Sequence, residues 1–136
     1  MADLSPEIEA ALEAHLRDTV GIPDIAWENG TYEPTTGTPY VEPFHVPTKR
    51  EPATRGNLFR TYYQGVFRIE CVVPANRGTG AARQLTSLVM NSFEANTDLI
   101  LASGKYATVR YATKETGIKE GAFYRVPVNV GWYAYD

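Results

Sequence analysis

The chain has 136 residues, of which 43% are hydrophobic and 21% charged, proportions typical of one globular domain spanning 1–136. Its formal net charge is −3 with a single cysteine, Cys71, which excludes an internal disulfide and a multi-thiolate metal site and favours a reducing compartment. No apolar run approaches the ~18 residues that a membrane span requires, and the acidic first ten residues predict no secretory export, so we expect a cytoplasmic, non-membrane protein.

The first third of the sequence predicts a helix followed by short strands. Ser5 is the expected N-cap and Pro6 suits the first helical position, and apolar residues then recur at helical spacing until 21–23 end the run. Residues 25–27 predict a strand that leads into a turn at 29–30. We expect an exposed loop over 29–39, a strand over 40–46 with an edge or bulge at Pro43, and a second exposed loop over 47–58.

The rest of the chain predicts a sheet and one more helix. Alternating apolar residues over 63–73 indicate a strand with one buried face, and Pro74 ends it. A helix over 80–95, which we expect Thr79 to cap, places apolar residues on one side, and strands follow over 99–102, 108–112 and 123–134. We expect Leu85, Leu88, Val89 and Phe93 to pack on the strand face that bears Phe67, Ile69, Cys71 and Val73. This order predicts an α+β fold: a mixed, mainly antiparallel sheet with the N-terminal and central helices packed on it.

A search for reactive groups yields no candidate site. His15 and His45 lack the partner spacing of metal ligands, and Cys71 falls on the buried alternation of its strand. The glycine-rich turn over 76–80 lacks the residues of a phosphate-binding loop. The sequence therefore predicts no catalytic residues, no cofactor and no metal, and its pI of about 5.4 argues against a dedicated nucleic-acid binder. Aromatic residues 62, 63, 132, 133 and 135 are expected to pack in the core or at an interface.

Charge is distributed unevenly along the chain. Residues 1–47 hold nine acids and one base, whereas residues 48–136 hold seven acids and twelve bases. Such asymmetry suits an acidic surface that meets a basic surface of a neighbouring subunit, and the alternative is an acidic helix face in contact with water. The candidate interface residues are Glu9 and Glu13 on the first helix and Lys49, Arg50, Glu51, Arg55 and Asn57 in the predicted loop.

Three segments together resemble the tail terminator and tail-completion family of long-tailed bacteriophages. They are the strand 65–74 that ends in proline, the glycine turn 78–83 before a helix ending in Phe93, and the final strand 124–130. The resemblance covers about residues 5–134. It implies a non-enzymatic virion protein of the tail or neck, assembled in the host cytoplasm. It further implies a hexameric ring that caps the tail tube, ends its polymerisation and joins the head. The implied partners are other copies of the chain, the major tail tube protein and a head–tail connector protein.

Two other interpretations remain open from the sequence. One is a different virion joint of similar size, such as a head–tail connector or stopper protein. The other is a small ligand-binding or enzymatic α+β domain, which would require a titratable cluster in a deep pocket.

Overall fold

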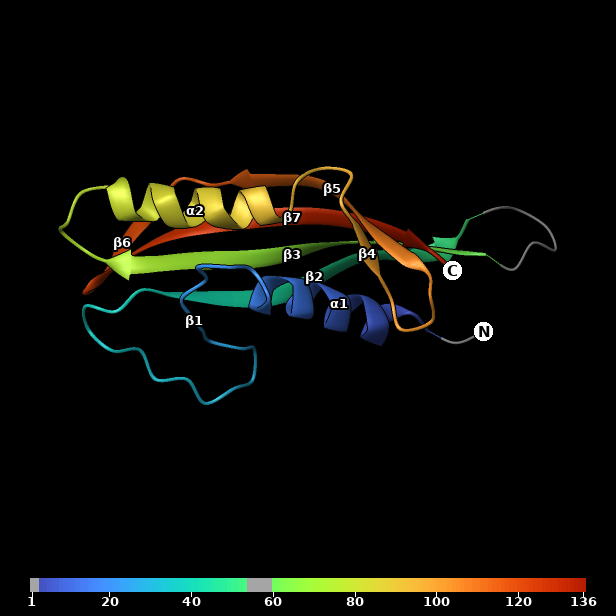
Figure 1. Cartoon of the computed structure of the whole chain (residues 1–136), viewed down its shortest axis with the longest axis horizontal. Helices are drawn as coiled ribbons and strands as arrows, with labels where there is room; N and C mark the ends of the chain where they lie inside the picture. The colour runs from blue at the N-terminus through green and yellow to red at the C-terminus, as the bar shows by residue number, and fades with distance from the viewer. Residues whose placement is uncertain (1–2, 54–59) are drawn as a thin grey trace.

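The computed structural model describes residues 3–53 and 60–136, within which the chain forms two helices and seven strands (Figure 1). The helices are α1 (Ser5–Arg17) and α2 (Gly80–Ser92). The strands are β1 (Asp24–Ile25), β2 (Tyr40–Pro52), β3 (Thr61–Pro74), β4 (Asp98–Ile100), β5 (Tyr106–Lys114), β6 (Ile118–Glu120) and β7 (Phe123–Tyr135).

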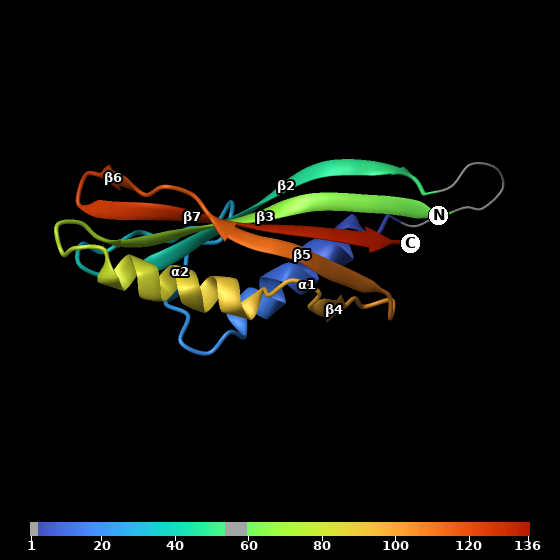
Figure 2. The same cartoon turned by 90° about the horizontal axis from the view of Figure 1, so that it is seen from above.

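All of these strands belong to one sheet, in the order β1-β2-β3-β7-β5-β4, with β6 paired to β7 beyond the end of β5. Only the β1–β2 pair is parallel among the described strands. The long central strands β3 and β7 pair along their whole lengths, and both helices lie on the same side of the sheet (Figure 2). The predicted α+β class, with a mixed and mainly antiparallel sheet, is confirmed.

The hydrophobic core lies between the sheet and the two helices. Alternate residues of β3 and β7 point into it, because successive side chains of a strand face opposite sides. The predicted packing of α2 on β3 is confirmed: Phe93 is fully buried, and its ring meets that of Phe67 edge to face at 6.0 Å. The apolar stripe of α1 completes the core with Ile8, Leu12 and Leu16.

The predicted helix caps are wrong in detail. Leu4 occupies the N-cap position of α1, and the Ser5 hydroxyl donates instead to the Asp3 carboxylate at 2.8 Å. Thr79 does precede α2, but its side chain makes no capping hydrogen bond. The helix also ends at Ser92 and not at residue 95, because the backbone of Phe93 leaves the helical region (φ −113°, ψ 48°).

The predicted loop over 47–58 is wrong for its first six residues, which continue β2 along β3 to Pro52. A register shift between Pro47 and Lys49 absorbs one extra residue at Thr48, as in a β-bulge. The segment is polar because it lies at a sheet edge, where it buries no side chain. Residues 54–59 lie outside the described part. The loop over 29–39 contains no helix or strand, and β6, whose residues are all exposed, was not predicted.

The outer edge of β2 is unsuited to pairing with another strand. The N–H and C=O groups of Val41 point away from β3, since the Val41 carbonyl accepts a hydrogen bond from the Ala26 N–H. The same groups of alternate residues after Val41 therefore also point away from β3. Pro43 and Pro47 have no N–H to offer there, and the Glu28 carboxylate accepts the hydrogen bond of the His45 N–H at 3.3 Å. Between Val41 and Pro47 this edge therefore offers no free outward N–H group to a further strand.

Candidate assembly surface

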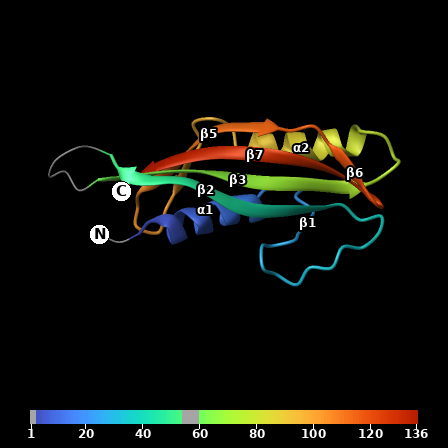
Figure 3. The same ribbon diagram turned by 180° about the vertical axis from the view of Figure 1, so that it is seen from behind.

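One face of the sheet is not covered by either helix. Figure 3 shows this side, on which β2, β3 and β7 run side by side with the helices behind them. We call it the open sheet face. Strand alternation places mainly polar and aromatic side chains on it, together with a small buried cluster of Ala26, Tyr40 and Val72.

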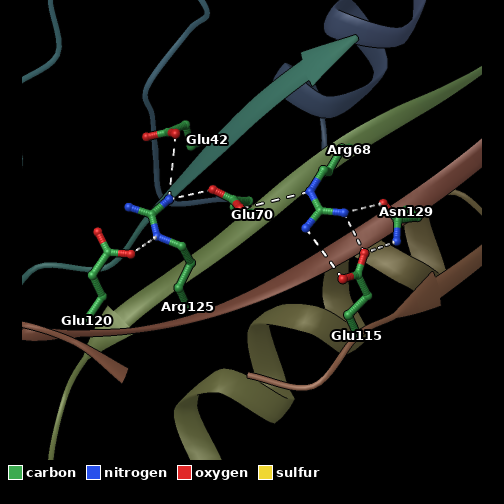
Figure 4. Close-up of polar contacts among 7 residues, drawn as sticks. All are labelled: Glu42, Arg68, Glu70, Glu115, Glu120, Arg125 and Asn129. Carbon is green, nitrogen blue, oxygen red and sulfur yellow. Dashed lines mark hydrogen bonds and ion pairs between the residues drawn. The ribbon is translucent and has the colours of Figure 1, made fainter. Parts of the chain in front are cut away.

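Arg125 of β7 is the centre of an ionic cluster on this face (Figure 4). Its guanidinium donates to Glu70 at 2.6 Å, lies 3.6 Å from Glu42 and 3.8 Å from Glu120, and lies 3.4 Å from the Tyr40 hydroxyl. Partial burial opposes the charged form, but the hydrogen bond and negative charge of Glu70 outweigh it and raise the pKa of Arg125 above its ordinary value.

Arg68 of β3 extends the same cluster. It lies 3.9 Å from Glu70, donates to Asn129 at 3.2 Å and forms an ion pair with Glu115. Asn129 also donates to Glu115 at 2.6 Å, and this hydrogen bond, with that of Arg68, lowers the pKa of the Glu115 carboxyl. Arg68 and Arg125 therefore have carboxylate partners within the chain.

Further along the open sheet face, arginines contact tyrosine rings. Arg110 lies 5.0 Å from the ring of Tyr133 and donates to the Tyr62 hydroxyl at 2.8 Å, while Arg60 lies 5.2 Å from the ring of Tyr135. These contacts are cation–π interactions, which hold a guanidinium in place without neutralising it. The tyrosine–arginine patch is defined as Arg60, Tyr62, Tyr106, Arg110, Tyr133 and Tyr135.

A hollow of about 380 Å³ opens in this patch, lined in part by Arg60, Tyr106 and Tyr135. The sequence pointed to residues 62, 133 and 135 as an aromatic cluster but not to Arg60 or Arg110. Alternation along β5 and β7 could have placed Arg110 on the same face as Tyr133. The register shift between Val109 and Tyr111 interrupts that alternation at Arg110.

Glu9 and Glu13, predicted as interface residues, lie on α1 beside the edge of β2. Together with Glu28 they line a groove of about 280 Å³, to which Trp27 also contributes. The Glu13 carboxylate lies 3.0 Å from Nε2 of His45. This acidic groove lies on the helix side of the sheet, so it faces a different direction from the tyrosine–arginine patch.

Lys49, Arg50 and Glu51 lie in the last part of β2, and all three are exposed. Lys49 lies 3.9 Å from Glu51, and the Arg50 guanidinium lies 5.9 Å from the ring of Tyr63. A second groove of about 250 Å³ has Glu9, Lys49 and Arg50 in its lining, so the structure brings these predicted residues together within one chain. Arg55 and Asn57 lie outside the described residues.

The histidines and the cysteine have structural surroundings. His15 lies 2.6 Å from the Ser92 carbonyl, His45 stacks on Phe67, and burial raises the pKa of the Cys71 thiol to about 12. Across residues 3–53 and 60–136, no three His, Cys, Asp or Glu side chains are grouped so that they could hold a metal ion. Nor is any helix in that part long and apolar enough to cross a membrane.

A family model described as phage tail terminator protein matches residues 7–132. The chain belongs to this family. The tail terminator chain is thus a structural protein of the phage virion. No curated protein sequence matched it.

Two solved structures share the fold of this tail terminator chain. One, which carries no functional name, is 24% identical with a TM-score of 0.73, over 96% of this chain and 94% of that chain. The other is a chain from the virion of a native gene transfer agent particle, 14% identical with a TM-score of 0.65 over 100% of both chains. At these identities the likeness concerns the fold alone.

Proposed function

We propose that this tail terminator caps the growing end of the tail tube as a ring, stops its polymerisation and presents a surface to which the head is joined. The observation that carries the proposal is the family match, which extends from α1 into β7 and so includes almost every element of the fold. The proposed partners are further copies of the chain in a hexameric ring, the major tail tube protein and a head–tail connector protein. Assembly takes place in the host cytoplasm.

The distribution of chemistry in the molecule supports an assembly role. The core of the described residues is apolar apart from Thr86, whose hydroxyl donates to the Ala82 carbonyl at 2.9 Å. The ion pairs and the arginine–tyrosine contacts lie outside this core, on the open sheet face and beside the edge of β2. Tyrosine and arginine are, with tryptophan, the residue types most enriched among the residues that dominate the binding energy of protein interfaces.

The test is a phage that lacks the gene, grown with and without a plasmid copy. A terminator limits tube length, so its loss is expected to give tubes of irregular length and heads without tails in negative-stain electron microscopy. The plasmid copy should restore uniform tails and infectivity.

The same experiment distinguishes a tail terminator from the alternative function, a head–tail connector or stopper protein. A head–tail connector or stopper acts on the head side, so its loss would leave tails of normal length beside unjoined heads. Uniform tails in the deletion phage would therefore overturn the terminator proposal.

A further inference from the structure

The arginines of the open sheet face fall into two groups. Arg68 and Arg125 each have carboxylate partners in the same chain. Arg60 and Arg110, by contrast, are held against tyrosine rings, and among the described residues neither has a carboxylate within 4.0 Å. The tyrosine–arginine patch thus presents two ordered positive charges beside exposed rings. Asp136, which also lines the hollow, is paired with Lys105, so the patch suits an acidic protein surface.

An acidic surface of the required kind is present on the chain itself. The acidic groove gathers Glu9, Glu13 and Glu28 beside the partly buried ring of Trp27. Of these carboxylates, Glu13 is paired with His45 and Glu28 accepts only a long backbone hydrogen bond from it, at 3.3 Å. The groove therefore has negative charge for the guanidinium groups and an aromatic face on which one of them can stack.

The two surfaces are placed so that one copy cannot use both on the same neighbour. The acidic groove lies on the helix side beside β2, near one edge of the sheet, whereas the tyrosine–arginine patch lies on the open face over β7 and β5. Two different patches that contact each other form a head-to-tail interface, and such interfaces generate rings when the rotation closes. Strand pairing is disfavoured along the part of β2 beside this groove, because Pro43 and Pro47 have no N–H and Glu28 accepts the hydrogen bond of the His45 N–H.

We propose that the tyrosine–arginine patch of one copy docks into the acidic groove of the next copy, and that Arg110 and Glu28 contribute the opposing charges. The occupant is a second copy of this chain. The inference rests on the proposed ring and names its contact surfaces. Glu9 and Glu13 of the acidic groove were also expected from the sequence, whereas the tyrosine–arginine patch takes the place of Lys49, Arg50 and Glu51.

Proximity is tested by chemical cross-linking in purified tails. Ala10→Cys places an exposed thiol on α1 next to Glu9, and Thr108→Cys places one in the hollow of the patch. Cys71 is buried with a pKa of about 12, so the introduced thiols are the reactive ones. With a flexible bismaleimide, the double variant is expected to give a denaturing-gel ladder that extends beyond the dimer, and each single variant none.

A ladder is diagnostic because a contact between these two different patches joins each copy to two neighbours only when it is head-to-tail. If the tails contain the chain but cross-linking gives no product, or gives dimers only, the inference is overturned and the terminator proposal stays intact. Tails without the chain would overturn both.

Necessity of the charges is tested by reversal. Arg110→Glu should lower infectivity of the complemented phage by about tenfold or more, because it places like charges in contact. Arg83→Glu, the same change at an exposed site on α2, is the control and should stay within about twofold. Glu28→Arg should restore part of the infectivity in the Arg110→Glu background. Wild-type infectivity of a folded Arg110→Glu variant would contradict the inference.

Discussion

Phe93 and Gly65 show how single residues fix the packing of the sheet. Phe93 lies just past the end of α2, where its ring meets those of His15 and Phe67 at 4.7 Å and 6.0 Å. Gly65 of β3 leaves room for the indole of Trp132 on the paired strand β7. The Phe93 ring thus enters the core where the chain leaves α2, and the Trp132 indole lies over a residue that has no side chain.

Phe93→Ala is expected to lower the free energy of unfolding by about 3 to 5 kcal/mol, because it leaves a cavity between both helices and the sheet. Chemical denaturation followed by circular dichroism measures the change. Ile100→Ala, at a position 70% exposed, is the control and should change stability by less than about 0.5 kcal/mol. Equal midpoints for the two variants would show that the packing described is wrong.

Gly65→Ala is expected to destabilise the protein by about 1 to 3 kcal/mol, because a Cβ there would lie 2.5 Å from Cζ2 of Trp132. Gly80→Ala is the matched control, since a Cβ at the start of α2 meets no atom within 4 Å. Alanine is also the better helix former, so this control should be neutral or gain up to about 1 kcal/mol. Thermal melts of both variants measure the difference. If Gly65→Ala is no less stable than Gly80→Ala, the indole of Trp132 does not lie against Gly65 as described.

At the scale of elements, regular hydrophobic patterns were sufficient to predict α1, α2, β3 and β7, because each buries one face against the same core. The end of β2 and all of β6 were not predictable in this way, since neither buries an apolar face. Their strand structure comes from pairing with β3 and β7, which a local pattern does not record. The cap of α1 was missed because Ser5 hydrogen-bonds to a neighbouring carboxylate, Asp3.

The ionic cluster joins side chains of different strands on the open sheet face. Its contribution should appear in the free energy of unfolding measured at acidic pH. The pKa of Glu115 lies below its ordinary value of 4.5 in the folded chain, so its contribution is present above that value and is lost as pH falls through the folded pKa. Glu115→Gln should therefore lose less stability than wild type between about pH 6 and about pH 3. Glu94→Gln, which removes an exposed carboxylate outside the cluster, is the control. Identical acid limbs for Glu115→Gln and wild type would contradict the assigned contacts.

We propose that Lys49, Arg50 and Glu51, which were expected from the sequence as interface residues, contact the end of the tail tube or an adjacent ring subunit. Their replacement by serine removes an exposed ion pair and the contact of Arg50 with the ring of Tyr63, which together should cost less than about 2 kcal/mol. If they contact the tube, phage complemented with this variant should make folded protein but few joined particles. Normal infectivity of the phage with this variant would show that Lys49, Arg50 and Glu51 are not needed for assembly.

At the scale of the whole molecule, the charge asymmetry seen in the sequence is partly cancelled inside the chain. Glu42 of the acidic segment 1–47 lies 3.6 Å from Arg125 of the basic segment 48–136, so these two charges meet within one chain. The sequence predicted correctly that Glu9 and Glu13 lie on one helix. It did not show which bases remain without carboxylate partners, because that depends on the register of β3, β5 and β7.

A tail terminator is defined by its position in the virion. Cryo-electron microscopy of tails that carry a labelled copy of this chain shows that position. We expect one ring of label at the head-proximal end of the tube, at the junction with the connector. Label along the tube, at the distal tip or within the head would contradict this expectation.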